Sequence, residues 1–512
     1  MENPEIPWTK IAVFDLNHGG LAIASQLLKK GVQITAFDIY KKMSDEKLQE
    51  ATKEYGFLVS NNPADLDPKD KTFELVCLPI HVDSKNEFVQ KAGELKIPTT
   101  THHDIVGRML HGDKRLEGKK LIEFTGVRGK TSACTLFAQM LSYKKCVGLH
   151  TSKGIFMWKD GKFKMIREGI SISPAYVPDI IDFIFESGYN PEIFVFEISL
   201  GSTGAEDIGI LTTLEPEYMV SGKSMTSTEV KTQIFTRAKE NGTFIVNYND
   251  WEKIKNYIRQ DQEIIVFDAS GKAVEDGKPT DVFLNITKGK DGKRTAEIES
   301  SRNSKFFSIG LRGGYDAEAY KTAFAASISA ALEFDVSESQ IMEALDQFGG
   351  ISGRMKETTE DGRHVLDNSN SGLDIYSCEW AIKYMLDKYF EKKSPHFDAT
   401  AKREFIVVIG EERQTVCEGI EPFAIDKLIE YYKKDIDKLI LVGDRLKKYM
   451  GDKCSRDVEQ EEAGAVDAPV EAGENGNVCT ALYADDFKSG FMKALEVSKE
   501  GDVIIMAVKS FR

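Results

Sequence analysis

The chain has 512 residues, 41% hydrophobic and 29% charged, which is enough for about three globular domains. Its net charge of −15 argues against a nucleic-acid partner, because such proteins bind phosphates through basic surfaces. The beginning of the chain lacks a signal-peptide pattern, and no apolar run approaches the roughly 20 residues of a membrane-spanning helix. Seven scattered cysteines without a C-x-x-C pair are typical of reduced thiols, so we expect a cytoplasmic protein. Because no membrane-spanning run is present, we expect no membrane partner.

The first part of the sequence reads as a small α/β unit. We expect a strand at 11–16, a helix ending near Lys30 and a second strand at 32–37. The turn after the first strand contains H-G-G at 18–20, which departs from the G-x-G-x-x-G of dinucleotide-binding folds and gives a nicotinamide site only weak support. We assign residues 1–118 to an N-terminal Rossmann-like domain that binds the substrate.

A glycine turn follows the next expected strand, at 121–125, and leads into a helix expected at 132–142. Two glycines let backbone N–H groups approach phosphate oxygens, a lysine supplies a cation for the β/γ end, and a hydroxyl at the helix N-terminus can hold Mg²⁺. The spacing is G-x-x-G-K-T, shorter than the common P-loop. We therefore predict a nucleoside triphosphate site formed by Thr125, Gly126, Val127, Arg128, Gly129, Lys130, Thr131 and Ser132.

Strands and helices alternate through 119–352, which predicts a central ATP-binding domain built on a mostly parallel sheet. A strand expected at 193–198 places Glu197 near its carboxyl end. Beside the phosphate-loop strand, this is where a further Mg²⁺ ligand belongs, although such a glutamate can also cap the following turn. We also expect one helix at 227–240.

A third run of strands and helices begins after the G-R-M sequence that contains Arg354, and we assign 353–512 to a C-terminal Rossmann-like domain. Residues 455–478 are acidic and rich in Ala, Gly and Glu, so we expect a disordered surface loop there. The basic stretch at 108–120 is a candidate surface for an acidic substrate, or equally a solvated linker.

The order of these motifs resembles that of the Mur ligase superfamily, which includes peptidoglycan amino-acid ligases and folylpolyglutamate synthetase. The shared features are T-G-x-x-G-K-T, a strand ending in Glu, a lysine before I-F, N-x-x-D, G-R-M and a polar turn led by Asp. Within the superfamily, D-L-N-H-G-G, F-E-I-S-L-G-S-T-G and D-N-S-N-S-G resemble the Mur-ligase-like coenzyme F430 synthetases of methanogens. The resemblance implies the three-domain α/β architecture of Mur ligases.

The resemblance also implies roles for the matching residues of the central domain, with ATP and Mg²⁺ as cofactors. Lys130 would contact the β/γ-phosphates, and Thr131 and Glu197 would hold Mg²⁺. Lys231 matches a lysine that several Mur ligases carbamylate to stabilise a second Mg²⁺, since a carbamate supplies the oxygen ligands that this ion requires.

Two further pairs complete the implied site. Asn247 and Asp250 match an adenine-side motif. Arg354 and Asp367 match residues of the third domain that close on the nucleotide, where the planar guanidinium can bridge two γ-phosphate oxygens. The implied catalytic residues are Lys130, Glu197, Lys231 and Arg354.

By this resemblance, the protein is an ATP-dependent ligase that activates a carboxylate as an acyl phosphate. It would cyclise the propionate of a nickel seco-tetrapyrrole acid into the carbocyclic ring of coenzyme F430. Two departures from amide-forming relatives support this: Tyr218 lies near the position of one family histidine, and Asn370 replaces another.

Other functions stay open from the sequence. One is an amide-forming Mur-type ligase that adds an amino acid to a (pseudo)murein precursor or a folate-like acid. Another is a nucleotide-dependent switch, although the N-K-x-D motif of GTPases is absent. His18, His102 and His103 lie in expected loops and are candidate nickel ligands, but a surface or turn role is the simpler interpretation.

Overall fold

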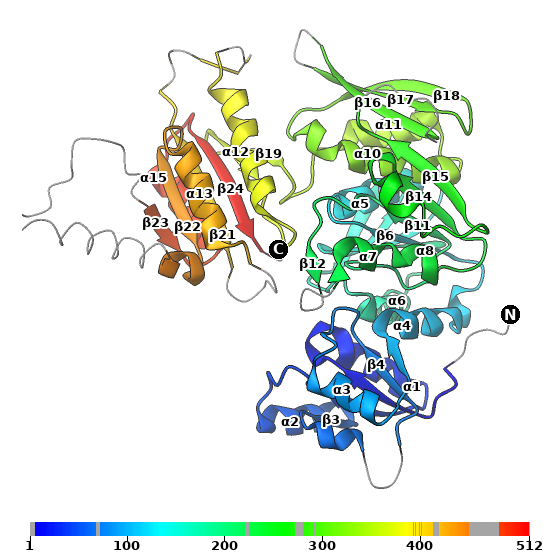
Figure 1. The fold of residues 1–512 in the computed structure, drawn as a ribbon. Helices are drawn as coiled ribbons and strands as arrows, with labels where there is room; N and C mark the ends of the chain where they lie inside the picture. The colour runs from blue at the N-terminus through cyan, green and yellow to red at the C-terminus, as the bar shows by residue number, and fades with distance from the viewer. Residues whose placement is uncertain are drawn as a thin grey trace, which may run out of the picture. The chain divides into compact units, whose positions relative to one another are not determined.

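The computed structural model of the chain describes residues 6–67, 72–220, 225–271, 280–289, 293–392, 394, 396–398, 400, 402–412, 419–449 and 481–510. The acidic loop expected at 455–478 lies outside these residues. The chain forms two units, which are described separately (Figure 1). The first comprises Met1–Thr287, Thr295–Ile309 and Tyr320–Asp346, and the second Lys288–Arg294, Gly310–Ala319 and Gln347–Arg512. The predicted boundaries at 118 and 352 stay predictions.

Five parallel strands form the first sheet, in the spatial order β3 (Leu58–Ser60), β2 (Gln33–Phe37), β1 (Lys10–Phe14), β4 (Leu75–Leu78) and β5 (Thr99–Thr101). The three inner strands, β2, β1 and β4, read as short apolar runs because helices cover both faces of the sheet. The strand order reverses between β1 and β4, and in open α/β sheets ligands bind at such a reversal, beyond the carboxyl ends of the strands. The helices are α1 (Leu21–Lys29), α2 (Asp45–Tyr55), α3 (Glu87–Glu94) and α4 (His102–His111).

The central sheet has eleven strands, in the order β18 (Lys305–Leu311), β17 (Arg294–Ser300), β16 (Val282–Lys288), β15 (Glu263–Asp268), β14 (Thr243–Asn247), β11 (Ile208–Leu211), β6 (Lys120–Thr125), β10 (Ile193–Glu197), β7 (Val147–Thr151), β8 (Gly154–Lys159) and β9 (Lys162–Arg167). The strands from β15 to β7 are parallel, as the alternating pattern predicts. The antiparallel extension through β8 and β9 was not expected.

The prediction of a single helix at 227–240 is wrong. The chain forms two short helices, α7 (Ser227–Lys231) and α8 (Gln233–Arg237), and Ala238 is extended with φ −53° and ψ 154°, so the second cannot continue. The remaining elements of this region are α5 (Lys130–Ser142), α6 (Val177–Glu186), α9 (Trp251–Ile254), α10 (Ala317–Glu333), α11 (Glu338–Gln347) and the paired strands β12 (Met219–Val220) and β13 (Met225–Thr226).

The first sheet and the central sheet share one hydrophobic core. A single buried cluster includes Val13 of β1, Met109 of α4, Ile181 of α6 and Phe194 of β10. Such a core cannot be divided without exposing apolar surface, which costs roughly 25 cal/mol for each Å². The N-terminal part and the central part therefore belong to one unit.

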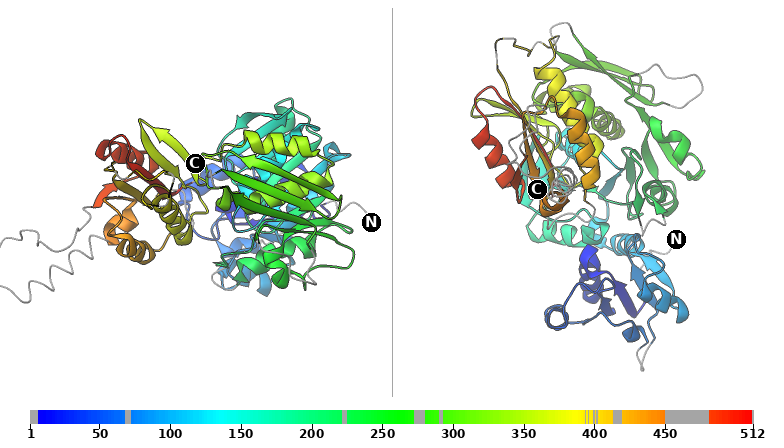
Figure 2. Two further views of the ribbon diagram at one scale, coloured as in Figure 1. Left: turned by 90° about the horizontal axis from the view of Figure 1, so that it is seen from above. Right: turned by 60° about the vertical axis from the view of Figure 1, so that its left-hand side comes forward.

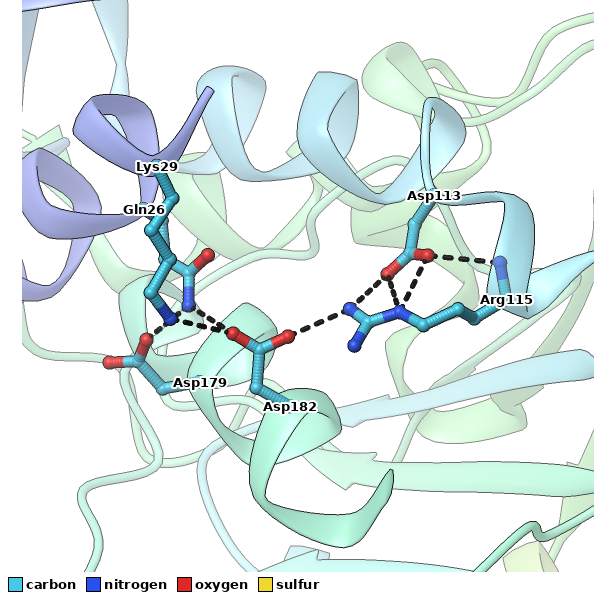
Figure 3. Close-up of polar contacts among 6 residues, drawn as sticks. All are labelled: Gln26, Lys29, Asp113, Arg115, Asp179 and Asp182. Carbon is cyan, nitrogen blue, oxygen red and sulfur yellow. Dashed lines mark hydrogen bonds and ion pairs between the residues drawn. The ribbon is translucent and has the colours of Figure 1, made fainter. Parts of the chain in front are cut away.

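Polar contacts flank this core at α6 (Figure 3). Asp182 accepts hydrogen bonds from Gln26 at 2.8 Å, from Lys29 at 2.9 Å and from Arg115 at 2.7 Å. The same arginine also contacts Asp113 at 2.6 Å. Arg115 belongs to the basic stretch considered above as a substrate surface, and the structure instead holds it between two carboxylates.

We expect Asp182→Asn to weaken this junction. Burial raises the pKa of Asp182, but hydrogen bonds from Gln26, Lys29 and Arg115 outweigh burial and lower the pKa to about 2. The charged carboxylate therefore stabilises the fold above the ordinary aspartate pKa, and this contribution is lost as the pH falls towards about 2. The variant should lose about 1–2 kcal/mol in the free energy of unfolding at neutral pH, measured by urea denaturation. Its stability should also fall less steeply than that of the wild type in acid.

Glu186→Gln is the matched control, because Glu186 lies exposed on the same helix. It should leave the free energy of unfolding within about 0.5 kcal/mol of the wild type. Equal effects of the two variants would contradict the assignment of this junction to Asp182.

The second unit is built on a six-stranded sheet, in the order β19 (Lys356–Glu360), β20 (Arg363–Asp367), β24 (Val503–Lys509), β21 (Phe405–Glu411), β22 (Lys438–Val442) and β23 (Ala481–Ala484). Its strands are parallel except at the β19–β20 hairpin. Two helices, α12 (Ile375–Tyr389) and α13 (Pro422–Tyr432), cover one face, and α15 (Phe487–Val497) covers the other (Figure 2). Among the described residues, no helix is both long enough and apolar enough to cross a membrane.

Candidate active site

Four neighbouring parallel strands of the central sheet end at one edge. In their register, Thr125 of β6 pairs with Leu211 of β11, and Glu197 of β10 pairs with Phe124 of β6. Because parallel strands present their carboxyl ends on the same side, the phosphate loop, Glu197 and Asn247 meet at this edge. The sequence predicted each of these residues separately, and the sheet brings them together.

The phosphate loop is fixed against the segment that follows β11. A Cβ atom added to Gly126, which has φ 137°, would lie 2.1 Å from Thr212 Oγ1, so only glycine allows this approach. The Val127 N–H donates to Thr213 O at 2.7 Å, and Thr212 Oγ1 donates to Arg128 O at 2.6 Å. These bonds hold the loop so that it leads directly into α5, whose first N–H groups have no intrahelical acceptor and favour an anion.

The side chains of the loop and of the first turn of α5 surround this N-terminus. Lys130 Nζ donates to Gly126 O at 2.9 Å, which holds the ammonium group against the loop. Thr131 and Ser132 are both buried in the first turn of α5. The Thr125 hydroxyl is also buried, and it makes no hydrogen bond within the described part of the chain.

A carboxylate and a hydroxyl face each other beside the loop. Thr131 Oγ1 donates to Glu197 Oε1 at 3.0 Å, and both residues are only 2% exposed. The other carboxylate oxygen accepts the Ser152 N–H at 2.9 Å, and Ser152 Oγ lies 3.4 Å from Thr131 Oγ1. Hard oxygen donors of this kind are the ligands that Mg²⁺ prefers, so the residues present fit that ion.

Two supporting residues were not assigned to the site from the sequence: Ser152 carried no recognised signal, and Thr212 was noted only as part of a T-x-L motif. Ser152 follows the end of β7, and Thr212 follows the end of β11. The strand ends were predictable, but which of them border the phosphate loop depends on the strand order of the sheet.

Lys231 lies at the end of α7 and is completely buried. Its Nζ donates to Ser199 O at 2.8 Å, two residues beyond Glu197. Burial, and after it the positive charge of Lys130, hold the pKa of Lys231 well below its usual range, while Glu197 acts in the opposite direction. A neutral amine is the form that can react with carbon dioxide.

Asn247 and Asp250 brace the segment after β11. Asn247 Nδ2 donates to Thr212 O at 2.9 Å, and Asp250 Oδ2 accepts the Leu214 N–H at 2.9 Å. Burial raises the pKa of Asp250 to about 6, against the effect of that hydrogen bond. Both residues therefore support the segment on which the phosphate loop rests, and their contact with adenine stays a prediction.

The two remaining predicted residues, Arg354 and Asp367, lie in the second unit, where the structure brings them to one turn. Asp367 Oδ2 accepts the Gly353 N–H at 2.8 Å, and Asn370 Nδ2 donates to Gly353 O at 2.8 Å. The backbone just before Arg354 is thus fixed on both sides. Asn370, which replaces a family histidine, has a structural role in this turn.

Comparisons with known proteins identify the family of two parts of the chain. Residues 124–327 match the family described as Mur ligase middle domain, and residues 357–510 match Coenzyme F430 synthetase CfbE, C-terminal domain. The first match contains the phosphate loop, Glu197, Lys231, Asn247 and Asp250.

Similar proteins cover almost the whole chain. Coenzyme F(430) synthetase of Methanosarcina acetivorans is 33% identical over 506 residues, which is 98% of this chain and 99% of that protein. The synthetase of Methanocaldococcus jannaschii is 25% identical, over 84% and 90% of the two chains. The crystal structure of MurF ligase from Thermotoga maritima in complex with ADP has a TM-score of 0.51 at 14% identity, over 98% of this chain and 94% of that one, which confirms the predicted fold class.

Proposed function

Because the chain belongs to the coenzyme F430 synthetase family of the Mur ligase superfamily, we propose that it catalyses the ATP-dependent closure of the carbocyclic ring of coenzyme F430. One observation carries the proposal. The phosphate loop and the Thr131–Glu197 pair meet at one sheet edge, in a chain similar to a coenzyme F(430) synthetase over 98% of its length. The proposed substrate is the open-ring nickel tetrapyrrole acid.

In the first step, a carboxylate oxygen of the substrate takes the γ-phosphoryl group of ATP, giving an acyl phosphate and ADP. The protein contributes positioning and charge. Lys130 and the N-terminus of α5 would neutralise the phosphates, and Arg354 would add a bidentate contact. Thr131 and Glu197 would hold Mg²⁺, which supplies further neutralisation of phosphate charge when bound.

In the second step, a carbon of the macrocycle attacks the acyl carbon. The C–O bond to phosphate breaks, phosphate leaves, and the attacking carbon loses a proton, so the product is a cyclic ketone. Because nucleophile and electrophile belong to one molecule, the step gains from proximity and needs no amine site. The absence of family histidines at Tyr218 and Asn370 supports a reaction without an amino-acid substrate.

The test is phosphate release from Mg·ATP with the open-ring nickel tetrapyrrole acid and no added amine, followed by mass spectrometry of the product. We expect turnover with loss of one water from the tetrapyrrole. Turnover that requires an amino acid and a nucleotide-linked peptide would instead assign the chain to the amide-forming ligases.

We further propose that Lys231 is carbamylated. Its buried amine, kept neutral by burial, would add carbon dioxide and release a proton, giving a carboxylate beside Glu197. Protein exchanged into ¹³C-bicarbonate should show a carbamate carbonyl signal by NMR, and Lys231→Ala should lose that signal. Lys239→Ala is the control, since that lysine is partly exposed and pairs with Asp207. A spectrum without a carbamate signal in the wild type contradicts the proposal.

We expect Asn370→His to leave ATP affinity unchanged, within about twofold by calorimetry. One imidazole N–H can replace the amide that donates to Gly353 O, so the backbone before Arg354 should keep its conformation. A loss of about tenfold or more in nucleotide affinity would contradict the purely structural role of Asn370.

A further inference from the structure

Two histidines and an aspartate gather where the strand order of the first sheet reverses. Asp15 follows the end of β1, and His81 follows the end of β4, the two strands between which the strand order reverses. His18 completes the group, and the potential ligand atoms of the three residues all lie within 4.8 Å of one another. In α/β sheets of this type, ligands bind at the reversal point, beyond the carboxyl ends of the strands.

The three side chains converge on one carboxylate oxygen. Asp15 Oδ2 lies 2.6 Å from His18 Nδ1 and 3.6 Å from His81 Nε2. Ligands held at about 2.1 Å from one ion lie roughly 3 Å apart, so these distances bracket the spacing of a metal site. His81 Nε2 is buried and makes no hydrogen bond to any described residue.

The backbone is arranged to place the carboxylate. Asp15 is fully buried with φ 69°, a conformation that is costly for a residue with a Cβ, and such strain concentrates at functional sites. Its Oδ1 accepts the N–H groups of Asn17 at 3.0 Å and His18 at 3.3 Å, which leaves Oδ2 directed at the imidazoles. At Gly19, which follows His18 and has φ 107°, an added Cβ would lie 2.3 Å from Ala175 Cβ, so only glycine fits there.

A short segment of the central part connects this group to the candidate active site. Ser173 Oγ donates to His18 O at 3.1 Å. The preceding residue, Ile172, accepts the Ser199 N–H at 3.0 Å, and Ser199 O accepts Lys231 Nζ. A ligand bound by His18 would therefore be linked, through residues 172–173 and Ser199, to Lys231 of the candidate active site.

We propose that Asp15, His18 and His81 form a binding site for a divalent transition-metal centre, through imidazole nitrogens supported by a carboxylate. Imidazole is a ligand suited to nickel, zinc and related ions. The metal can come from two sources: a free ion, or the nickel of the macrocyclic substrate, which offers axial positions. The second source rests on the proposed function, and the first does not.

The other two histidines considered from the sequence do not belong to this site. His102 and His103 lie in the first turn of α4, not in a loop, and both are buried. His102 donates from Nε2 to Phe14 O, and His103 donates from Nε2 to Leu200 O, so both rings have a structural role. His81, 63 positions beyond His18, was not recognised from the sequence.

The experiment uses the full chain, free of purification tags and metals. In one arm, NiCl₂ alone is titrated by calorimetry into the wild type, His18→Gln and His81→Gln. In the other, the open-ring nickel tetrapyrrole acid is titrated into the same proteins, and its absorption spectrum reports axial ligation. His396→Gln is the control, since that exposed histidine lies in the second unit, and thermal unfolding checks that every variant is folded.

Either of two results supports the site. Free Ni²⁺ binds once per chain, with affinity at least tenfold weaker in the two variants, or the tetrapyrrole spectrum changes on binding and the change is lost in them. If neither probe responds to His18 and His81, the metal site is overturned. Normal phosphate release by the wild type would then leave the proposed function standing. Conversely, Ni²⁺ binding without turnover of the tetrapyrrole would reject the function and keep the site.

Discussion

Lys130→Ala is expected to abolish turnover, with kcat at least about 10³-fold lower than in the wild type. The Lys130 ammonium is held against the phosphate loop by Gly126 O at 2.9 Å, at the beginning of α5. During phosphoryl transfer the charge is spread over phosphate oxygens, and a cation fixed in advance stabilises it without reorganisation. The measurement is the initial rate of phosphate release at saturating Mg·ATP.

Lys120→Ala is the matched control for this variant. Lys120 begins the same strand, β6, at the end away from the phosphate loop, and is exposed beside Asp207. We expect its activity to stay within about twofold of the wild type, because exposed ion pairs contribute little. Normal activity of Lys130→Ala would contradict the assignment of residues 125–132 to a nucleotide site.

Glu197→Gln is expected to lower kcat by about 10²–10³-fold and to raise the Mg²⁺ concentration required for half-maximal activity. The amide is nearly isosteric and its oxygen can still accept the Ser152 N–H, so the fold should be kept. What is lost is the negative charge beside Thr131 Oγ1, which a hard divalent cation requires. A titration of activity with MgCl₂ separates weaker metal binding from a slower reaction.

Glu192→Gln provides the comparison on the same strand. Glu192 immediately precedes β10, is exposed and pairs with Lys145. Its Mg²⁺ dependence should match that of the wild type. If the Mg²⁺ dependence of Glu197→Gln equals that of the wild type, Glu197 is not a Mg²⁺ ligand, however large the loss in rate.

The phosphate loop was predictable because all its signals are contiguous. An apolar strand, two glycines, a lysine and two hydroxyls within 12 positions fix both the local geometry and the chemistry. The strand that ends at Glu197 was predictable for the same reason, since a buried strand reads as a continuous apolar run. The resemblance to Mur ligases rested on the order of such local motifs, and the similarity along the whole chain confirms it.

The prediction of one helix at 227–240 was wrong. The residues there suit a helix locally, but the chain becomes extended at Ala238 and the helix ends. The strands β8 and β9 were also missed. β9 is the edge strand and is largely exposed, so its sequence carries no buried face to mark it. In both cases the outcome depends on neighbouring elements that a local pattern does not contain.

The sequence by itself determined the α/β class, the phosphate loop and the family, because these depend on residues close together in the chain or on their order. Only the tertiary structure decided which distant residues meet. Thr131 faces Glu197 across 66 positions because β6 and β10 are adjacent and parallel. His81 reaches Asp15 because β4 lies beside β1. The pairing of strands arises from burying both faces of a sheet at once, a long-range condition that no single stretch of sequence records.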